Sequence, residues 1–204
     1  MKIIGLTGGI AAGKNFVSEI FSKEGAWIFD ADKESHKILE ENQEIILLVI
    51  EKFPQAAQNN KICREILGKI VFGDAKNLKI LEEIIYPNVR KNYQEFLKKA
   101  KNEGAEMLVL NVPLLLEKQG YEYDFLVVVV ADLKLRNERF IKRELAKRPR
   151  EVFELEQKFS RIIARQMSDE DRTKNADFVI NCNESEEDII ARTREIILAI
   201  KQKL

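Results

Sequence analysis

The stretch that decides the fold runs from Lys2 to Phe21 and reads KIIGLTGGIAAGKNFVSEIF. Its apolar residues at 3–6 are typical of a short buried strand, and those at 16–21 recur at helical spacing. A glycine-rich segment at 8–14 separates the two. A strand, a glycine-rich turn and a helix in this order predict an α/β fold that begins with an anion-binding loop.

Gly8 and Gly13 stand five positions apart, and Lys14 follows directly. This is the Gly-x-x-x-x-Gly-Lys pattern whose backbone amides surround the phosphates of a nucleoside triphosphate. Glycine suits it because side chains would block the approach of the backbone to the ligand. A plain glycine-rich turn is the alternative, but the flanking strand and helix favour a phosphate loop.

The predicted ATP contacts extend from the first glycine to the start of the helix. They are Gly8, Gly9, Ile10, Ala11, Ala12, Gly13, Lys14, Asn15 and Phe16. Asn15 is unusual, because a Ser or Thr normally offers a hydroxyl to Mg²⁺ at this position. We expect Asn15 to reach Mg²⁺ through a bound water, or to contact a phosphate through its NH₂ group.

Composition limits the partners. With 204 residues, the chain is long enough for one substantial α/β domain with inserted segments. Lys plus Arg and Asp plus Glu number 34 each, so net charge gives no general attraction to nucleic acid or to a membrane surface. Cys63 and Cys182 have no motif spacing. With no apolar stretch long enough for a signal peptide or a membrane span, we expect a cytoplasmic protein.

A pair of carboxylates follows the second predicted strand, residues 26–29. Asp30 and Asp32 sit where that strand ends, and ligands of open parallel sheets bind outside the carboxyl ends of the strands. Asp32 can accept a proton from an attacking hydroxyl while Asp30 orients Mg²⁺ or its water. Asp is also a favoured helix N-cap, but beside a phosphate loop we favour catalysis. His36, the only histidine, fits a functional or a bland role equally well.

Residues 33–104 are almost wholly helical in pattern, which predicts a helical insertion between the second and third strands. Gly68, Gly73, Pro54 and Pro87 are expected to break it into pieces of one to three turns. Such an insertion commonly carries a second substrate, although plain packing would give the same pattern. Arg64, after a weak turn at 58–61, has the pattern of a surface arginine.

The second half of the chain supplies three more strands. Residues 107–112 and 125–130 are nearly all apolar, which is typical of buried parallel strands. Residues 177–181 form a fifth strand, before a terminal amphipathic helix at 185–204. Strands alternating with helices predict a doubly wound five-stranded parallel sheet.

A cationic stripe lies between the fourth and fifth strands. Arg136, Arg139, Arg143 and Lys147 are three, four and four residues apart, so they share one helix face. The stripe fits a solvated face, an RNA contact, or a lid whose arginines close over the triphosphate. Zero net charge argues against RNA, and a phosphate loop needs cationic partners, to which Arg161 also contributes. Arg136 is assigned to the solvated part of the face.

Several motifs together resemble the dephospho-coenzyme A kinases. They match that family in order and spacing over the whole chain: GLTGGIAAGK (5–14), DAD (30–32), YP (86–87), VPLLLE (112–117), RQ (165–166) and ADFVIN (176–181). The resemblance implies ATP-dependent phosphorylation of the ribose 3′-hydroxyl of dephospho-coenzyme A. It also implies a fold like that of nucleoside monophosphate kinases, with core, substrate domain and lid.

The resemblance also implies roles for individual residues. Lys14, Asp32, Arg139 and Arg143 match catalytic positions. The resemblance places Asn183 near the adenine of ATP, and Arg64 and Glu117 at the acceptor pocket. We further expect the acceptor to contact Asp32, His36, Tyr86, Pro87, Leu114 and Arg161. The chain departs from the family at Ala11 and Ala12, which replace Gly-Ser, at Tyr86, which replaces a His, and at Glu184, which replaces a Gly.

Together these features predict a single kinase domain. Its core comprises about 1–32, 104–132 and 166–204, its acceptor-binding insertion about 33–103 and its lid about 133–165. ATP and Mg²⁺ are the expected cofactors, and dephospho-coenzyme A, rather than nucleic acid or a membrane, is the expected partner. Two alternatives remain: a kinase of another nucleotide or small hydroxyl compound, and a regulatory nucleotide-binding module, which Asn15 suggests.

Overall fold

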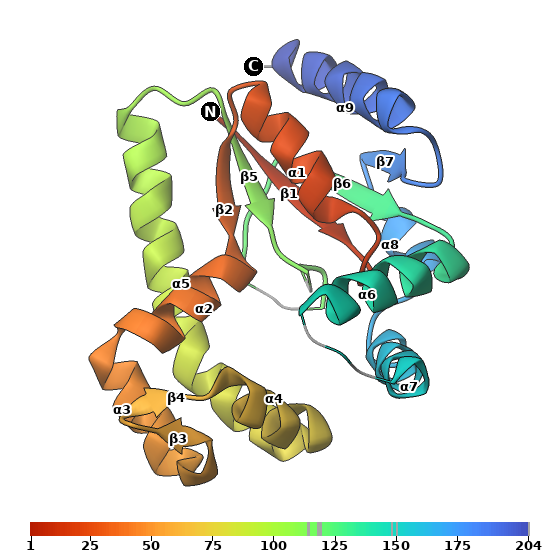
Figure 1. The fold of residues 1–204 in the computed structure, drawn as a ribbon. Helices are drawn as coiled ribbons and strands as arrows, with labels where there is room; N and C mark the ends of the chain where they lie inside the picture. The colour runs from red at the N-terminus through yellow and green to blue at the C-terminus, as the bar shows by residue number, and fades with distance from the viewer. Residues whose placement is uncertain (114, 118–119, 148, 150, 204) are drawn as a thin grey trace. The chain divides into compact units, whose positions relative to one another are not determined.

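The computed structural model describes residues 1–113, 115–117, 120–147, 149 and 151–203 (Figure 1). The chain divides into two compact units. The first, here called the core unit, comprises Met1–Phe29 and Ala100–Leu204, and the second, the inserted unit, comprises Asp30–Lys99. Leu114, expected near the acceptor, lies outside the described residues.

A five-stranded sheet of order β2-β5-β1-β6-β7 organises the core unit. The strands are β1 (Lys2–Gly8), β2 (Trp27–Asp30), β5 (Met107–Asn111), β6 (Phe125–Val130) and β7 (Phe178–Asn181). β1 pairs in parallel with both β5 and β6, and β6 pairs in parallel with β7. The chain crosses from one side of β1 to the other between β5 and β6, so the predicted doubly wound parallel sheet is confirmed.

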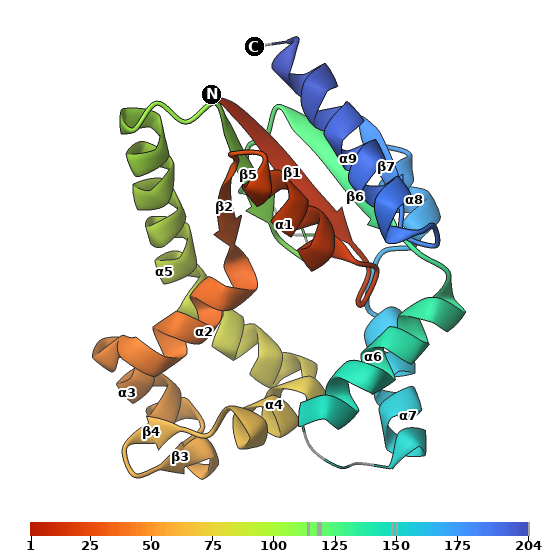
Figure 2. The same ribbon diagram turned by 45° about the horizontal axis from the view of Figure 1, so that its top comes forward.

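The three middle strands, β5, β1 and β6, are largely buried because helices cover them. Every residue of β5, and all but the last of β6, is buried, which explains their continuous apolar runs. Helices α1 (Lys14–Lys23) and α9 (Glu186–Lys201) pack against each other on one face, while α8 (Asp169–Thr173) packs against β6 (Figures 1 and 2). β1, the middle strand of the sheet, therefore leads from the buried core directly into the phosphate loop.

Helices α6 (Leu133–Lys147) and α7 (Val152–Ile163) form a second, smaller apolar cluster. Phe140, Leu155 and Phe159 make up its buried part, with the two rings 5.6 Å apart. Ile10 and Ala11 of the phosphate loop pack against the same cluster. The α6–α7 pair is thus fixed to the loop by apolar contacts as well as by the polar ones described below.

The inserted unit is mainly helical, as predicted. It contains α2 (Ala31–Glu41), α3 (Gln43–Lys52), the 3-10 turn η1 (Pro54–Ala56), β3 (Ala57–Gln58), β4 (Lys61–Ile62), α4 (Arg64–Gly73) and most of α5 (Ala75–Asn102). The weak turn at 58–61 is the tip of a small hairpin. Asn59 and Asn60 have φ values of 50° and 58°, the left-handed pair that a two-residue hairpin turn requires.

The prediction that Gly68 and Pro87 break the insertion is wrong, because Gly68 lies inside α4 and Pro87 lies inside α5, a helix of 28 residues. Proline removes one backbone donor and crowds the preceding turn, but it need not end a helix that packing supports. Leu81, Ile85, Val89 and Tyr93 recur every fourth residue and are all buried. This continuous apolar stripe on both sides of Pro87 outweighs the local penalty.

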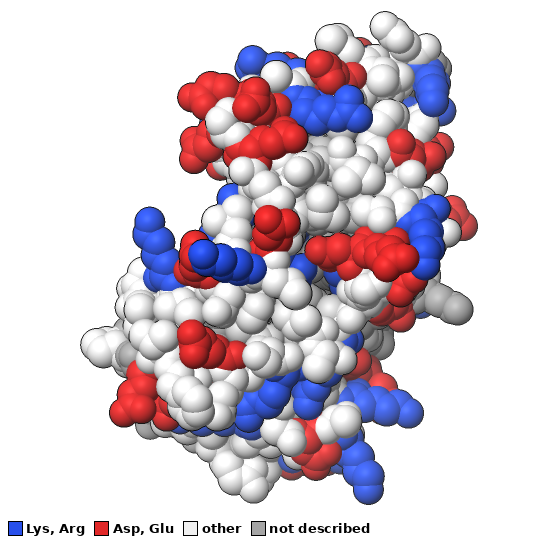
Figure 3. Space-filling view, turned by 90° about the vertical axis from the view of Figure 1, so that its right-hand side faces the viewer, with Lys and Arg blue, Asp and Glu red and all other residues white. Residues whose placement is uncertain are grey.

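Acidic and basic side chains are interspersed on the face drawn in Figure 3, as their equal totals of 34 suggest. This is the pattern of a mixed surface rather than of a single-sign field. Among the described residues, no helix combines the length and apolar character needed to cross a membrane.

Candidate active site

The phosphate loop joins β1 to α1 and opens the helix toward an anion. Gly13 is the N-cap of α1, with φ 114° and no side-chain cap. A Cβ at this position would lie 2.9 Å from the Sγ of Cys182, so both the backbone angle and the close approach require glycine. Because glycine has no side chain, Gly13 cannot cap the first amides of α1. The amino end of the helix therefore suits a phosphate.

Lys14 crosses the loop from its last position to its first. Its Nζ donates to the carbonyl oxygen of Gly8 at 3.1 Å. Ala12 N donates to the carbonyl oxygen of Gly9 at 3.2 Å, which closes the turn between them. The lysine charge is thus held beside the first residue of the loop, where it can meet the β and γ phosphates.

The arginines of α6 divide into different environments. Arg139 donates through NH2 to the carbonyl oxygen of Cys182 at 2.9 Å, and through NH1 to that of Ala12 at 3.5 Å. The exposed Arg143 places its guanidinium 5.6 Å from the Phe140 ring centroid. Arg139 is thus at the loop, whereas Arg143 is exposed and lies beside the Phe140 ring.

The assignment of Arg136 to a solvated face is wrong. Its side chain is only 3% exposed, and its Nε donates to the carbonyl oxygen of Ile10 at 2.8 Å. NH1 pairs with Asp169 at 2.9 Å. Burial lowers the Arg136 pKa, whereas the charge of Asp169 raises it. The helical spacing correctly put Arg136 beside Arg139, but the face points toward the loop rather than toward solvent.

Asn15 and Asn111 meet at the carboxyl edge of the sheet. Asn111, the last residue of β5, donates from Nδ2 to Oδ1 of Asn15 at 3.4 Å. In phosphate-loop NTPases, a Ser or Thr and a Walker-B Asp are the usual Mg²⁺ ligands. Here the side-chain amides of Asn111, which ends β5, and Asn15, which follows the loop, lie together instead. Among the described residues there is also no group of three or more His, Cys, Asp or Glu side chains that could hold a metal.

In the inserted unit, Asp30 is the N-cap of α2 and its Oδ1 accepts from Lys33 N at 3.0 Å. Asp30 therefore caps α2, as the capping alternative predicts, while Asp32 lies exposed in the first turn. Burial and the Arg64 charge lower the pKa of His36, against Asp32, Glu40 and Asp30, which raise it. Arg64 pairs with Glu40 at 3.0 Å. Asp32, His36 and Arg64 thus belong to one charged cluster.

The other expected site residues have mostly structural contacts. Tyr86 and Pro87 lie within α5, and Arg161 is exposed on α7. Asn183 Oδ1 accepts from Asp132 N at 2.8 Å, which joins the segments after β6 and β7. Glu117 Oε1 accepts from Arg172 NH2 at 2.9 Å and from Met167 N at 3.1 Å.

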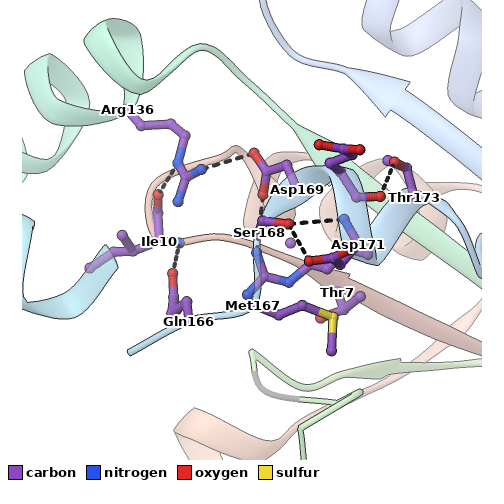
Figure 4. Close-up of polar contacts among 12 residues, drawn as sticks. Thr7, Ile10, Arg136, Gln166, Met167, Ser168, Asp169, Asp171 and Thr173 are labelled. Atoms are coloured by element: carbon purple, nitrogen blue, oxygen red, sulfur yellow. Dashed lines mark hydrogen bonds and ion pairs between the residues drawn. The ribbon is translucent and has the colours of Figure 1, made fainter. Parts of the chain in front are cut away.

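Sequence reasoning missed a polar network beside the loop. Gln166 Oε1 accepts from Ile10 N at 3.0 Å, and Asp169 accepts from Arg136 (Figure 4). Asp169 also accepts from Arg172. Two signals were available: Gln166 belongs to the RQ motif, and Asp169 and Arg172 are three apart. Neither signal shows which distant backbone the side chains bind.

A five-stranded parallel sheet, a phosphate loop on its middle strand and an arginine-bearing helix against that loop define a phosphate-loop kinase. The family model described as "Dephospho-CoA kinase" matches residues 2–188, and the chain therefore belongs to the dephospho-CoA kinase family.

Individual relatives agree over nearly the whole length. A dephospho-CoA kinase of Bartonella henselae is 38% identical over 205 residues, covering 100% of this chain and 98% of the relative. A crystal structure of a Thermus thermophilus protein has a TM-score of 0.80 at 30% identity, covering 97% of this chain and 96% of the other. A Campylobacter jejuni dephospho-CoA kinase has a TM-score of 0.67 at 27% identity, covering 98% of each chain. The chain is accordingly an ATP-using enzyme with dephospho-CoA kinase activity.

Proposed function

We propose that Asp32 is the general base of this reaction and accepts the proton of the attacking ribose hydroxyl. The observation that carries the proposal is its position. Asp32 is exposed in the first turn of α2, two residues beyond the end of β2. Because β2 and β1 belong to one parallel sheet, their carboxyl ends face the same edge, at which the loop begins.

We further assign the phosphoryl group to the loop amides, Lys14, Arg139 and Arg143. Transfer of a phosphoryl group needs positioning and charge stabilisation more than covalent help from the protein. Arg139 already lies at the loop through Ala12 and Cys182. Arg143, one turn further along α6, is exposed and suited to reach the phosphoryl group when ligands are bound.

The predicted division into core, acceptor-binding insertion (33–103) and lid (133–165) completes the proposal. The insertion supplies His36, Arg64, Tyr86 and Pro87 to the acceptor, and Glu117 and Arg161 come from the rest of the chain. Leu114 is included among the acceptor contacts only because it belongs to the VPLLLE motif (112–117). A lid that excludes water limits the hydrolysis of ATP that an open site would allow.

Mg²⁺ is proposed as the metal, because one side chain at the loop offers an oxygen ligand of the kind that Mg²⁺ prefers. The Asn15 side chain is exposed and carries a hard oxygen, and Mg²⁺ in such sites is bound mainly by waters and substrate phosphates. Asn15, through a bound water, and Asp30 would hold it. When bound, the ion would supply positive charge to the transferring phosphoryl group.

A cytoplasmic location and a small-molecule acceptor, rather than nucleic acid or a membrane, are part of the same proposal. Cys63 and Cys182 are both free thiols, which a reducing compartment preserves.

The test is Asp32→Asn with Glu44→Gln as its matched control, because Glu44 is likewise exposed and occupies the same position in α3. Asp32→Asn should lower kcat about a hundred-fold or more, with little change in the dissociation constant of ATP measured calorimetrically. Near-normal kcat in Asp32→Asn would refute the assignment. Assaying the wild type with dephospho-CoA, adenosine monophosphate and shikimate as acceptors shows how strictly the acceptor is selected.

A further inference from the structure

Both backbone polar groups of Ile10, its N–H and its carbonyl oxygen, are hydrogen-bonded to side chains. Arg136 donates to its carbonyl oxygen at 2.8 Å, and Gln166 accepts from its amide at 3.0 Å (Figure 4). These partners lie 126 and 156 residues further along the chain. Arg136 and Gln166, here called the Ile10 clamp, leave the residue little freedom to rotate either backbone group.

The next residue explains why such a clamp is needed. Ala11 has φ 56°, in the left-handed region that an L-residue with a Cβ disfavours. A backbone held in that region persists only where the surroundings over-determine it. On one side Ile10 is clamped, and on the other Ala12 donates to Gly9 and accepts from Arg139. The methyl group of Ala11 also packs against the α6–α7 apolar cluster.

The Arg136 side of the clamp is itself rigid. Asp169 binds Arg136 with Oδ2 and Arg172 with Oδ1, at 2.9 and 3.0 Å. Arg172 is fully buried and donates through NH2 to Glu117. The two arginines and the two carboxylates together carry no net charge, which makes the burial of the two arginines tolerable. Gly9 completes the fit, because a Cβ there would collide with the Arg136 guanidinium.

We propose that the Ile10 clamp holds Ala11 in its left-handed conformation and thereby keeps the phosphate loop in the shape that binds ATP. Arg136 and Gln166 are thus positioning residues for the known reaction, acting through the loop backbone. Glycine adopts the left-handed region without steric cost. A loop with Ala11 should therefore depend on the clamp more than a loop with glycine at position 11.

The test uses Gln166→Met, which keeps the bulk of the side chain and removes the acceptor for Ile10 N. Gln166 is only partly buried, so its replacement is milder than that of the buried Arg136. The matched control is Gln157→Met at an exposed site on α7. Ala11→Gly is made both alone and in combination with Gln166→Met, which completes the double-mutant cycle. For each protein the ATP dissociation constant is measured by calorimetry without acceptor, beside kcat, both KM values and the melting temperature.

We expect Gln166→Met to weaken ATP binding about ten-fold, which corresponds to about 1.4 kcal/mol. The KM for dephospho-CoA should stay near that of the wild type, and Gln157→Met should bind ATP like the wild type. Adding Ala11→Gly should recover at least about three-fold of the lost ATP affinity.

Two results would overturn the proposal. One is an unchanged ATP dissociation constant in Gln166→Met, whether or not the melting temperature falls, since this would make the contact purely structural. The other is strict additivity of Ala11→Gly and Gln166→Met, which would show that the clamp does not act through Ala11. Neither measurement depends on the role proposed for Asp32, because ATP binding is measured without acceptor.

Discussion

Glu144 on α6 should stabilise the pairing of α6 with α7 through charge. Its side chain is only 8% exposed, and its two carboxylate oxygens accept from Lys147 and Lys158, each at 2.7 Å. Lys158 belongs to α7, so this bond joins the two helices. Burial raises the Glu144 pKa, but the bonds and charges of the two lysines outweigh it and lower the pKa to about 2.

The change to test is Glu144→Gln, which keeps the shape and removes the charge. A hydrogen bond to a charged group contributes about 1.5–3 kcal/mol. The lysines are partly solvated, with side chains 63% and 36% exposed, so we expect a total loss of about 2 kcal/mol at pH 7. For a chain of this size, that loss lowers the melting temperature by roughly 4–8 °C. Glu138→Gln, at an exposed site on the same helix, is the control.

The pH dependence gives a sharper check. Because the folded pKa of about 2 lies below the ordinary value of 4.5, the stabilisation is fully present above pH 4.5 and is lost as the pH falls through about 2. The gap in melting temperature between wild type and Glu144→Gln should therefore shrink between pH 7 and pH 3. A gap that is absent at pH 7, or that stays constant down to pH 3, would refute this account of Glu144.

Two further predictions concern the site. Asn15→Thr should lower the Mg²⁺ concentration for half-maximal activity about ten-fold, because a hydroxyl is a more compact ligand than an amide that is bonded to Asn111. An unchanged or weaker dependence of activity on Mg²⁺ would contradict this prediction. Arg143→Ala should reduce kcat by two or more orders of magnitude with little loss of melting temperature, whereas Lys142→Ala, also exposed on α6, should leave kcat near that of the wild type. Equal and small losses in both variants would make Arg143 part of a charged helix face only.

The sheet and its phosphate loop were predictable because their signals are local. Apolar runs at 107–111 and 125–130 need only a buried environment to become strands, and helices that alternate with them leave a parallel sheet as the simple solution. The loop likewise shows its glycines and lysine within seven residues. Family resemblance supplied the acceptor, since no local pattern distinguishes one hydroxyl substrate from another.

The errors arose where distant packing decided the outcome. Pro87 has a strong local tendency to end a helix, yet a buried stripe on either side of it maintains α5. Arg136 belongs to a charged stripe that is normally solvated, but its partners are Asp169, 33 residues away, and Ile10, 126 residues away. A charge pattern on one helix identifies a face and leaves open what that face meets.

The phosphate loop of this chain is therefore not a self-contained motif. A glycine at position 11 would adopt the left-handed conformation unaided, whereas Ala11 needs neighbours that hold it. Those neighbours come from α6, from Gln166 after α7 and, through Asp169 and Arg172, from α8. Because α6 also carries Arg139 and Arg143, any movement of this helix shifts the loop and the cationic side chains together. The affinity for ATP and the stabilisation of the phosphoryl group should accordingly respond as one when the packing of α6 is altered.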